Sequence, residues 1–314
     1  SSSHAYGGTG GGGAGGSILV NTVGLDGSGL FQANGGKAGD RINLATLNYG
    51  TGGGGGGGRI VVRSKDDSLF TNKTGVQAEG GAGGTGGTNG AAGGRGTVAF
   101  ITLDPTADTT VDDTTADDLS LELYRSWRWE PSEEPYNYQK VTIHPDTVVV
   151  AGSDANLTAS ELIMTAATWD TTIDSTNGFA ASGQVTINTT QMTVSSSTIQ
   201  MGNSADWTVN VQGSYTHTGS TLNAQMIDIN GAADVTFTGS TTVTAQRMFI
   251  DGSSLAITAG TTLSTDGRGH ANQAGPGAGG ASSTYSGAGG GHGGHGGHDR
   301  ERVSGGSSAH GSRG

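Results

Sequence analysis

The chain has no cysteine, little charge and few aromatic residues. The absence of cysteine among its 314 residues excludes a disulfide framework and a thiol nucleophile. Charged residues make up 13% of the sequence, aromatic residues 5%, and only 5 residues are proline. No apolar run approaches the roughly 18 residues of a membrane span, so we expect none. No charged and apolar leader opens the sequence, which predicts that a signal peptide is absent or already removed.

Sequence signatures of catalysis and of nucleic-acid binding are also missing. The net charge of −12, with Lys and Arg scattered along the chain, disfavours binding to phosphate backbones. The sequence contains no G-x-S-x-G, H-E-x-x-H or Walker A motif. Its glycine runs match G-x-G-x-x-G, but without the strand–helix context that gives this motif its meaning. We therefore predict that the protein is not an enzyme and needs no cofactor.

Glycine is the residue that the chain has in excess, with 61 copies that lack the strict G-X-Y period of collagen. A longer repeat organises the first hundred residues. A glycine run precedes Ile18-Leu-Val, and Phe31-Gln-Ala-Asn-Gly-Gly follows; the same order returns at Ile60-Val-Val and Val76-Gln-Ala-Glu-Gly-Gly. Glycine segments can form an extended helix of three residues per turn whose bare faces pack closely. The repeat thus predicts short strands alternating with packed polyglycine-type segments.

Residues 141–266 are rich in threonine and alternate polar with apolar residues, a pattern typical of β-strands. Gly219-Ser-Thr, Gly239-Ser-Thr and Gly260-Thr-Thr recur 20 and 21 residues apart. This period matches one coil of a β-helix, so we predict an all-β fold of right-handed β-solenoid type, with rungs of about 20 residues and little or no helix. A β-sandwich is the alternative.

Composition divides the chain into four regions. They are a Gly-rich repeat (1–103), an acidic and aromatic connecting or capping segment (104–140), the Thr-rich region (141–266) and a Gly/Ser/His-rich segment (267–314). The last region holds a glycine run without a following strand, and the chain opens on a glycine run without a preceding one. We expect either head-to-tail docking of successive chains or a segment of a longer tandem protein.

The glycine runs, the Arg59-Ile-Val-Val and Gln77-Ala-Glu-Gly-Gly motifs and Leu263-Ser-Thr-Asp-Gly-Arg-Gly-His ahead of a glycine tract resemble repeats of very large Gly-rich surface proteins. This resemblance covers the first hundred and the last fifty residues. It implies a β-helical architecture and an extracellular, adhesin-like or fibrous role, and it supplies no catalytic residues.

Two groups of residues could bind metal. His292, His295 and His298 would share one face of a three-fold helix, roughly 9 Å apart, which is too far for a single zinc ion. They could bridge chains or face solvent. Asp112, Asp113, Asp117 and Asp118, with Asp104 and Asp108 nearby, could hold Ca²⁺, or form a solvated acidic loop.

Trp127, Trp129, Tyr136 and Tyr138 cluster beside Arg125 and Arg128. They could form a contact surface for glycans or another subunit, or a cap over one end of the solenoid. Asn72, Asn156 and Asn188 lie in N-x-S/T triplets and are candidate glycosylation sites. The sequence favours a secreted structural protein that forms a filament with itself; the alternative is an adhesin or glycan-binding module at the cell surface.

Overall fold

A computed structural model describes residues 9–40, 50–86, 88–104, 118–129, 136–151, 155–172, 182–202 and 204–266. The chain divides into two compact units, Ser1–Val243 with Arg247–Leu263 and Thr244–Gln246 with Ser264–Gly314, and the architecture that follows is that of the first. The described residues contain no α-helix and one short 3-10 turn, η1 (Lys73–Gly75). The all-β prediction is confirmed.

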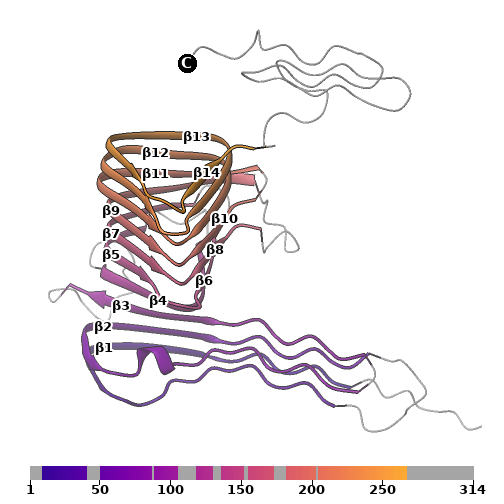
Figure 1. Ribbon diagram of the computed structural model, residues 1–314. Helices are drawn as coiled ribbons and strands as arrows, with labels where there is room; N and C mark the ends of the chain where they lie inside the picture. Colours follow the sequence, from indigo (N-terminus) through magenta and orange to yellow (C-terminus); the bar gives the residue numbers. More distant parts are fainter. Residues whose placement is uncertain are drawn as a thin grey trace, which may run out of the picture. The chain divides into compact units, whose positions relative to one another are not determined.

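The described residues form fourteen strands. They are β1 (Ser17–Gly27), β2 (Arg59–Phe70), β3 (Thr97–Leu103), β4 (Asp118–Trp129), β5 (Tyr136–Ile143), β6 (Val148–Ala151), β7 (Asn156–Thr165), β8 (Thr168–Asp170), β9 (Ser182–Ser195), β10 (Thr198–Gln200), β11 (Ser204–Thr218), β12 (Thr221–Thr238), β13 (Thr242–Ile257) and β14 (Thr262–Ser264). All belong to one hydrogen-bonded sheet (Figure 1).

The first three strands follow the sequence repeat. β1 pairs with β2 in parallel, with Ser17 opposite Arg59, and β2 pairs with β3 in parallel, with Arg59 opposite Thr97. The glycine runs before each strand therefore also lie side by side. β3 then pairs antiparallel with β4, which lies within the predicted connecting segment 104–140. Part of that segment is thus a full member of the sheet.

The glycine segments form a bundle held by backbone hydrogen bonds. Donors to any one neighbouring segment recur at every third residue, as expected for an extended three-fold helix. Adjacent residues of one segment donate to different neighbouring segments. The bonds from one segment to the next equivalent one are Gly12 N to Gly53 O (2.9 Å), Gly15 N to Gly56 O (2.8 Å), Gly54 N to Ala91 O (2.8 Å) and Gly57 N to Gly94 O (2.9 Å). The bonds to the returning segments include Gly36 N to Gly13 O (2.7 Å), Gly55 N to Gly36 O (3.0 Å) and Gly81 N to Gly55 O (2.7 Å).

Backbones in this bundle approach so closely that side chains are excluded at most inward positions. A Cβ atom at Gly55 would overlap the carbonyl oxygen of Gly13, and one at Gly54 would overlap that of Gly81. Glycine is therefore the packing element here, because only its bare Cα lets the segments reach hydrogen-bonding distance.

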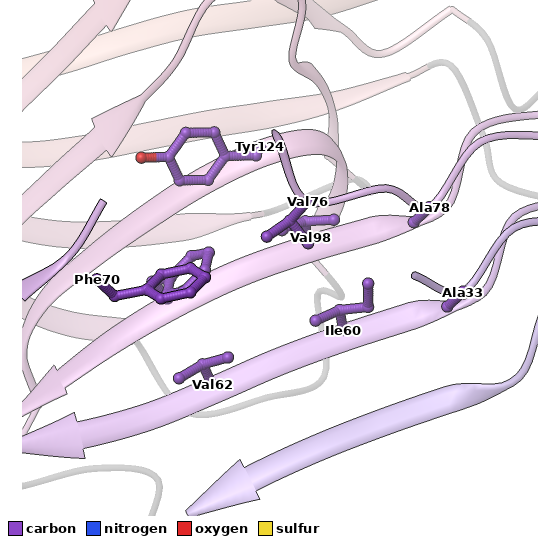
Figure 2. Packing of buried hydrophobic residues seen from close by; sticks show 9 residues of the cluster. Ala33, Ile60, Val62, Phe70, Val76, Ala78, Val98 and Tyr124 are labelled. Atoms are coloured by element: carbon purple, nitrogen blue, oxygen red, sulfur yellow. The ribbon is translucent and has the colours of Figure 1, made fainter. Parts of the chain in front are cut away.

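A small apolar cluster lies between the strands of this region and their returning segments. Figure 2 shows Ile60 and Val62 of β2 facing Phe70, Val76 and their neighbours. An aromatic row crosses the cluster from repeat to repeat. Its ring centroids are 5.6 Å apart for Phe31–Phe70, 5.9 Å for Phe70–Phe100, 5.8 Å for Phe100–Tyr124 and 4.1 Å for Tyr124–His144.

From β4 onwards the pairing path closes on itself. β4, β5, β7, β9, β11, β12, β10, β8 and β6 form a ring of nine strands, and every pair in this ring is parallel. The closed ring was not predicted from the sequence. β13 extends the sheet beyond β12.

The ring closes because β4 and β12 each contact two partners with different halves. In β4, Leu121 faces Val141 of β5, whereas Trp127 faces Val149 of β6. β12 divides in the same way between β10 and β11. Two rows of buried side chains fill the interior. They are Leu121, Val141, Leu162, Met192, Tyr215 and Val235, and Leu123, Ile143, Met164, Val194, His217 and Phe237.

One corner of the ring repeats a left-handed backbone conformation after successive strands. The residues with positive φ at this corner are Asp146 (62°), Ala166 (45°), Ser196 (50°), Gly219 (56°), Gly239 (67°) and Gly260 (87°). They are linked by bonds such as Ser196 N to Thr218 O (2.9 Å) and Gly219 N to Thr238 O (3.0 Å). The predicted glycine repeat thus marks a turn at which glycine has no steric cost.

Candidate functional site: the open edges of the sheet

β1 is the first strand of the pairing path, and among the described residues it pairs with β2 alone. Its other edge presents backbone N–H and C=O groups to the outside over 11 residues. The side chains of Leu19 and Val23 are 66% and 65% exposed, and Asp26 is the strand's only charged residue. β1 contains no proline or lysine, and its protection against edge pairing is limited to Asp26 and a register irregularity between Gly24 and Asp26.

The glycine segment before β1 continues this open edge. Gly12 and Gly15 face neighbouring backbones inside the bundle, whereas a Cβ at Gly10, Gly13 or Gly16 would meet no atom of the described part of the chain within 4 Å. These three positions, at the three-residue period of the helix, form a bare backbone face, which we call the outer glycine face. It is the same kind of surface that the inner segments use to pack against one another.

The far end of the described stack is open too. Leu255 and Ile257 of β13 come 20 positions after Val235 and Phe237, and the flanking Ser254–Asp234 and Thr258–Thr238 side-chain hydrogen bonds have the same offset. Although they continue the two buried rows, they are 51% and 49% exposed. The interior rows therefore end on partly uncovered apolar side chains within the described residues.

A cluster of ionisable groups lies where the glycine region meets β4. The Glu122 carboxylate accepts hydrogen bonds from Lys73 (2.8 Å) and Tyr124 (2.7 Å) and lies 3.0 Å from His144 Nε2, while Lys73 also pairs with Asp67 (3.1 Å). Burial alone would raise the pKa of Glu122, but the bonds from His144, Lys73 and Tyr124 outweigh it and lower the pKa to about 2. The carboxylate is thus fully ionised and occupied by its partners, as in a structural ion network.

The aromatic residues proposed as a contact surface lie mostly inside. Trp127 and Trp129 are 8% and 2% exposed, so neither indole ring offers a face to a partner. Trp129 stacks on Trp169 at 4.9 Å, and Trp169 meets Trp207 edge-on at 5.2 Å. This corrects the contact-surface interpretation for the two tryptophans, whose side chains are buried. Tyr138 is half-buried and lines a groove, and the side chain of Tyr136 lies outside the described residues.

Two of the three glycosylation candidates belong to a ladder of asparagine side chains. Asn188 Nδ2 donates to Asn156 Oδ1 (3.0 Å), Asn210 Nδ2 to Asn188 Oδ1 (2.8 Å) and Asn230 Nδ2 to Asn210 Oδ1 (3.3 Å). Asn156 is exposed, and Asn188 is half-buried. The third candidate, Asn72, is half-buried and donates to the Gly29 carbonyl (3.1 Å).

The remaining candidates lie largely beyond the structure's described part. His292, His295 and His298 are outside the described residues, as are Asp108, Asp112, Asp113 and Asp117 and the side chain of Asp118. Within the described ranges, no three His, Cys, Asp or Glu side chains gather in a way that could hold a metal ion. The same ranges contain no helix that is long and apolar enough to cross a membrane.

Asn210 and Asn230 were not predicted as site residues, although Asn188, Asn210 and Asn230 recur 22 and 20 positions apart. This spacing equals the register offset of their strands and was the available signal. In comparisons with family models, curated proteins and solved structures, no match to the chain was found.

Proposed function

We propose that the protein is a structural subunit of an extracellular filament, assembled head to tail through the open edges of its sheet. The open edge of β1, which is irregular only near its end at Gly24 and Asp26, carries this proposal. Parallel strands with a free edge are templates for further strands, and a chain that remains monomeric is expected to blunt that edge. An asymmetric contact between two different ends does not close on itself and repeats without limit.

We also propose that residues 118–266 form a β-solenoid. The division of β4 and β12 between two partners supports this interpretation, since one long strand that turns a corner belongs to two faces of a coil. The stacked left-handed corner and the two buried rows, which advance by 20 to 30 residues per strand pair, also support it. In a solenoid, the uncovered end rows would require a cap or another subunit.

The donor segment of the filament would be the Gly-rich region 267–314 of a neighbouring copy, laid along the outer glycine face. Its glycine run has the composition of the segments that already pack in the bundle. Close packing against Gly10, Gly13 and Gly16 would repeat the arrangement seen between Gly12 and Gly53. The exposed Asn156, within an Asn-Leu-Thr triplet, supports an extracellular location.

The substitution Gly13→Val tests this assembly directly. Because open space surrounds Gly13, valine should leave the subunit folded, but it would hold a neighbouring backbone too far away to hydrogen-bond. We expect fibres of the unsubstituted protein in negative-stain electron microscopy and none of the variant, at equal melting temperatures.

The control is Gly94→Val. Gly94 also has open space around it, but it lies in the glycine segment directly before β3, which β2 separates from β1 in the sheet. This variant should form fibres. If Gly13→Val assembles as well as the unsubstituted chain, docking through the outer glycine face is wrong.

A further inference from the structure

The asparagine ladder lies along a groove in the outer surface of the ring. The groove has a volume of about 460 Å³ and takes residues from five neighbouring strands, β5, β7, β9, β11 and β12. At about 4.8 Å between strands, this path is roughly 19 Å long. It is an elongated channel that crosses the strands.

The groove exists because the strands bend at this position. β11 contains two residues, Gln212 and Gly213, where β9 has the single residue Thr190, and the register shifts there. At Gly213 a Cβ would lie only 2.7 Å from the carbonyl oxygen of Thr190. In β12 the bend falls at Gly231, whose φ of 76° suits glycine. The irregular backbone thus opens a concave surface in an otherwise regular sheet.

The polar groups of the groove are amides and hydroxyls. Along the ladder each internal asparagine donates one N–H and accepts one hydrogen bond, so its second N–H and its second lone pair are left for a ligand. Asn210 and Gln212 of β11 are exposed, and so is Thr190 of the neighbouring strand β9. Donors and acceptors therefore alternate along the floor at the spacing of the strands.

The lining carries no charge. All twelve residues around the groove are uncharged, in a chain whose net charge is −12. An anionic or cationic ligand would find no counter-charge in this channel. At one end of the groove, on β5, Tyr138 provides a ring of the kind that packs against apolar faces while its hydroxyl stays in contact with polar groups.

We propose that this groove binds an extended neutral polysaccharide. Such a chain presents a hydroxyl-rich edge that both donates and accepts, repeats at about the length of one sugar ring and carries no charge. Its hydroxyls would pair with the free amide positions of Asn188, Asn210 and Asn230, and a sugar ring would pack on Tyr138. This site is separate from the tryptophans first considered for glycan contact and does not depend on filament assembly.

Titration of the full chain with neutral hexasaccharides tests the proposal. Cellohexaose, xylohexaose and mannohexaose serve as probes, with the anionic hexamer of galacturonic acid as a comparison, and binding is followed by calorimetry. We expect saturable binding of at least one neutral probe and none of the anionic one. Failure of all three neutral probes to bind overturns the proposal.

Matched variants distinguish a binding site from a merely structural ladder. Asn210→Ala should weaken binding about tenfold or more, whereas Asn223→Ala should not, because Asn223 donates to Gln200 in a different side-chain pair outside the groove. Tyr138→Ala should also weaken binding, and Tyr138→Phe should preserve it. If Asn210→Ala and Asn223→Ala bind equally well, the ladder is structural only.

Discussion

The glycine bundle repeats about every 40 residues and the nine-stranded ring every 20 to 30, and the two are packed by different groups. In the bundle, neighbouring backbones contact each other directly, and hydrogen bonds run from each segment to several others. In the ring, the backbone hydrogen bonds of the sheet join neighbouring strands, and large side chains such as Trp169, Trp207 and Phe237 fill the space inside.

This difference changes what glycine does. In the bundle, Gly54 and Gly55 are required because a side chain has no room, whatever its rotamer. In the ring, Gly219 and Gly260 are favoured because of their positive φ, although Ala166 and Ser196 occupy the same corner. One residue type therefore serves packing in one region and backbone conformation in the other.

The largest expected effect on stability comes from a pair of substitutions within one glycine run. Gly55→Ala would place a methyl group on the carbonyl of Gly13, and we expect it to lower the free energy of unfolding by about 3 kcal/mol or more. Gly56→Ala faces Gly94 O at 3.9 Å, so it should be neutral or stabilise by up to about 1 kcal/mol. Chemical denaturation followed by circular dichroism measures both.

Equal stabilities of the two alanine variants would mean that the segments are not packed backbone to backbone. The sequence alone could not have distinguished Gly55 from Gly56, since both lie in an uninterrupted run of glycine. The distinction comes from the three-fold helix, which directs adjacent residues to different neighbours.

Other parts of the fold could be predicted because they depend on local spacing. The sequence offset between Ile18 and Ile60 equals the register offset of β1 and β2, although the parallel pairing itself was not predicted, and the alternation of apolar residues predicted the strands of the ring. Closure of the ring could not be predicted, because it depends on one strand turning a corner, and β4 has no residue pattern that separates its two halves.

The glycine triplets of the ring were found in the sequence. Aligning them letter by letter, however, pairs Ser220 with Ser240, whereas in the structure Ser220 corresponds to Thr241. In Gly219-Ser-Thr the buried hydroxyl is that of Ser220, whereas in Gly239-Ser-Thr it is that of Thr241. Ser240 is an additional exposed residue at the second corner. Sequence identity aligned the two triplets, but the need to bury a hydroxyl that bonds to the Thr238 carbonyl (2.6 Å) decides the register.

A second prediction tests the side-chain interior of the ring. His217 is fully buried between Val194 and Phe237 in its row, and burial lowers its pKa to about 4. Protonation therefore favours the unfolded state, where the pKa is about 6.5. The contribution of His217 to stability is intact above about pH 6.5 and is lost as the pH falls towards 4, by roughly 3 kcal/mol in total.

His217→Phe, which copies Phe237 opposite it on β12, has no titrating group at this position. Its free energy of unfolding, measured from pH 7 to pH 4, should decline less steeply than that of the unsubstituted chain. Glu122 and the other carboxylates are common to both proteins, so their effects cancel in the difference. Parallel pH profiles would show that His217 is not buried as a neutral group.

The smallest expected effect on stability concerns the left-handed corner of the ring, where glycine is favoured by its backbone conformation. Ala166 has a φ of 45°, which costs a residue with a Cβ about 1 kcal/mol relative to glycine. We therefore expect Ala166→Gly to stabilise the fold slightly and Gly219→Ala, at the equivalent corner with nothing within 4 Å of its Cβ, to destabilise it by a similar amount. Thermal unfolding of the two variants and of the double variant measures this. Because Ala166 follows β7 and Gly219 follows β11, the two changes in stability should be independent and sum nearly to zero in the double variant. A Gly219→Ala loss as large as that of Gly55→Ala would instead mean that the corner, like the bundle, excludes side chains for lack of space.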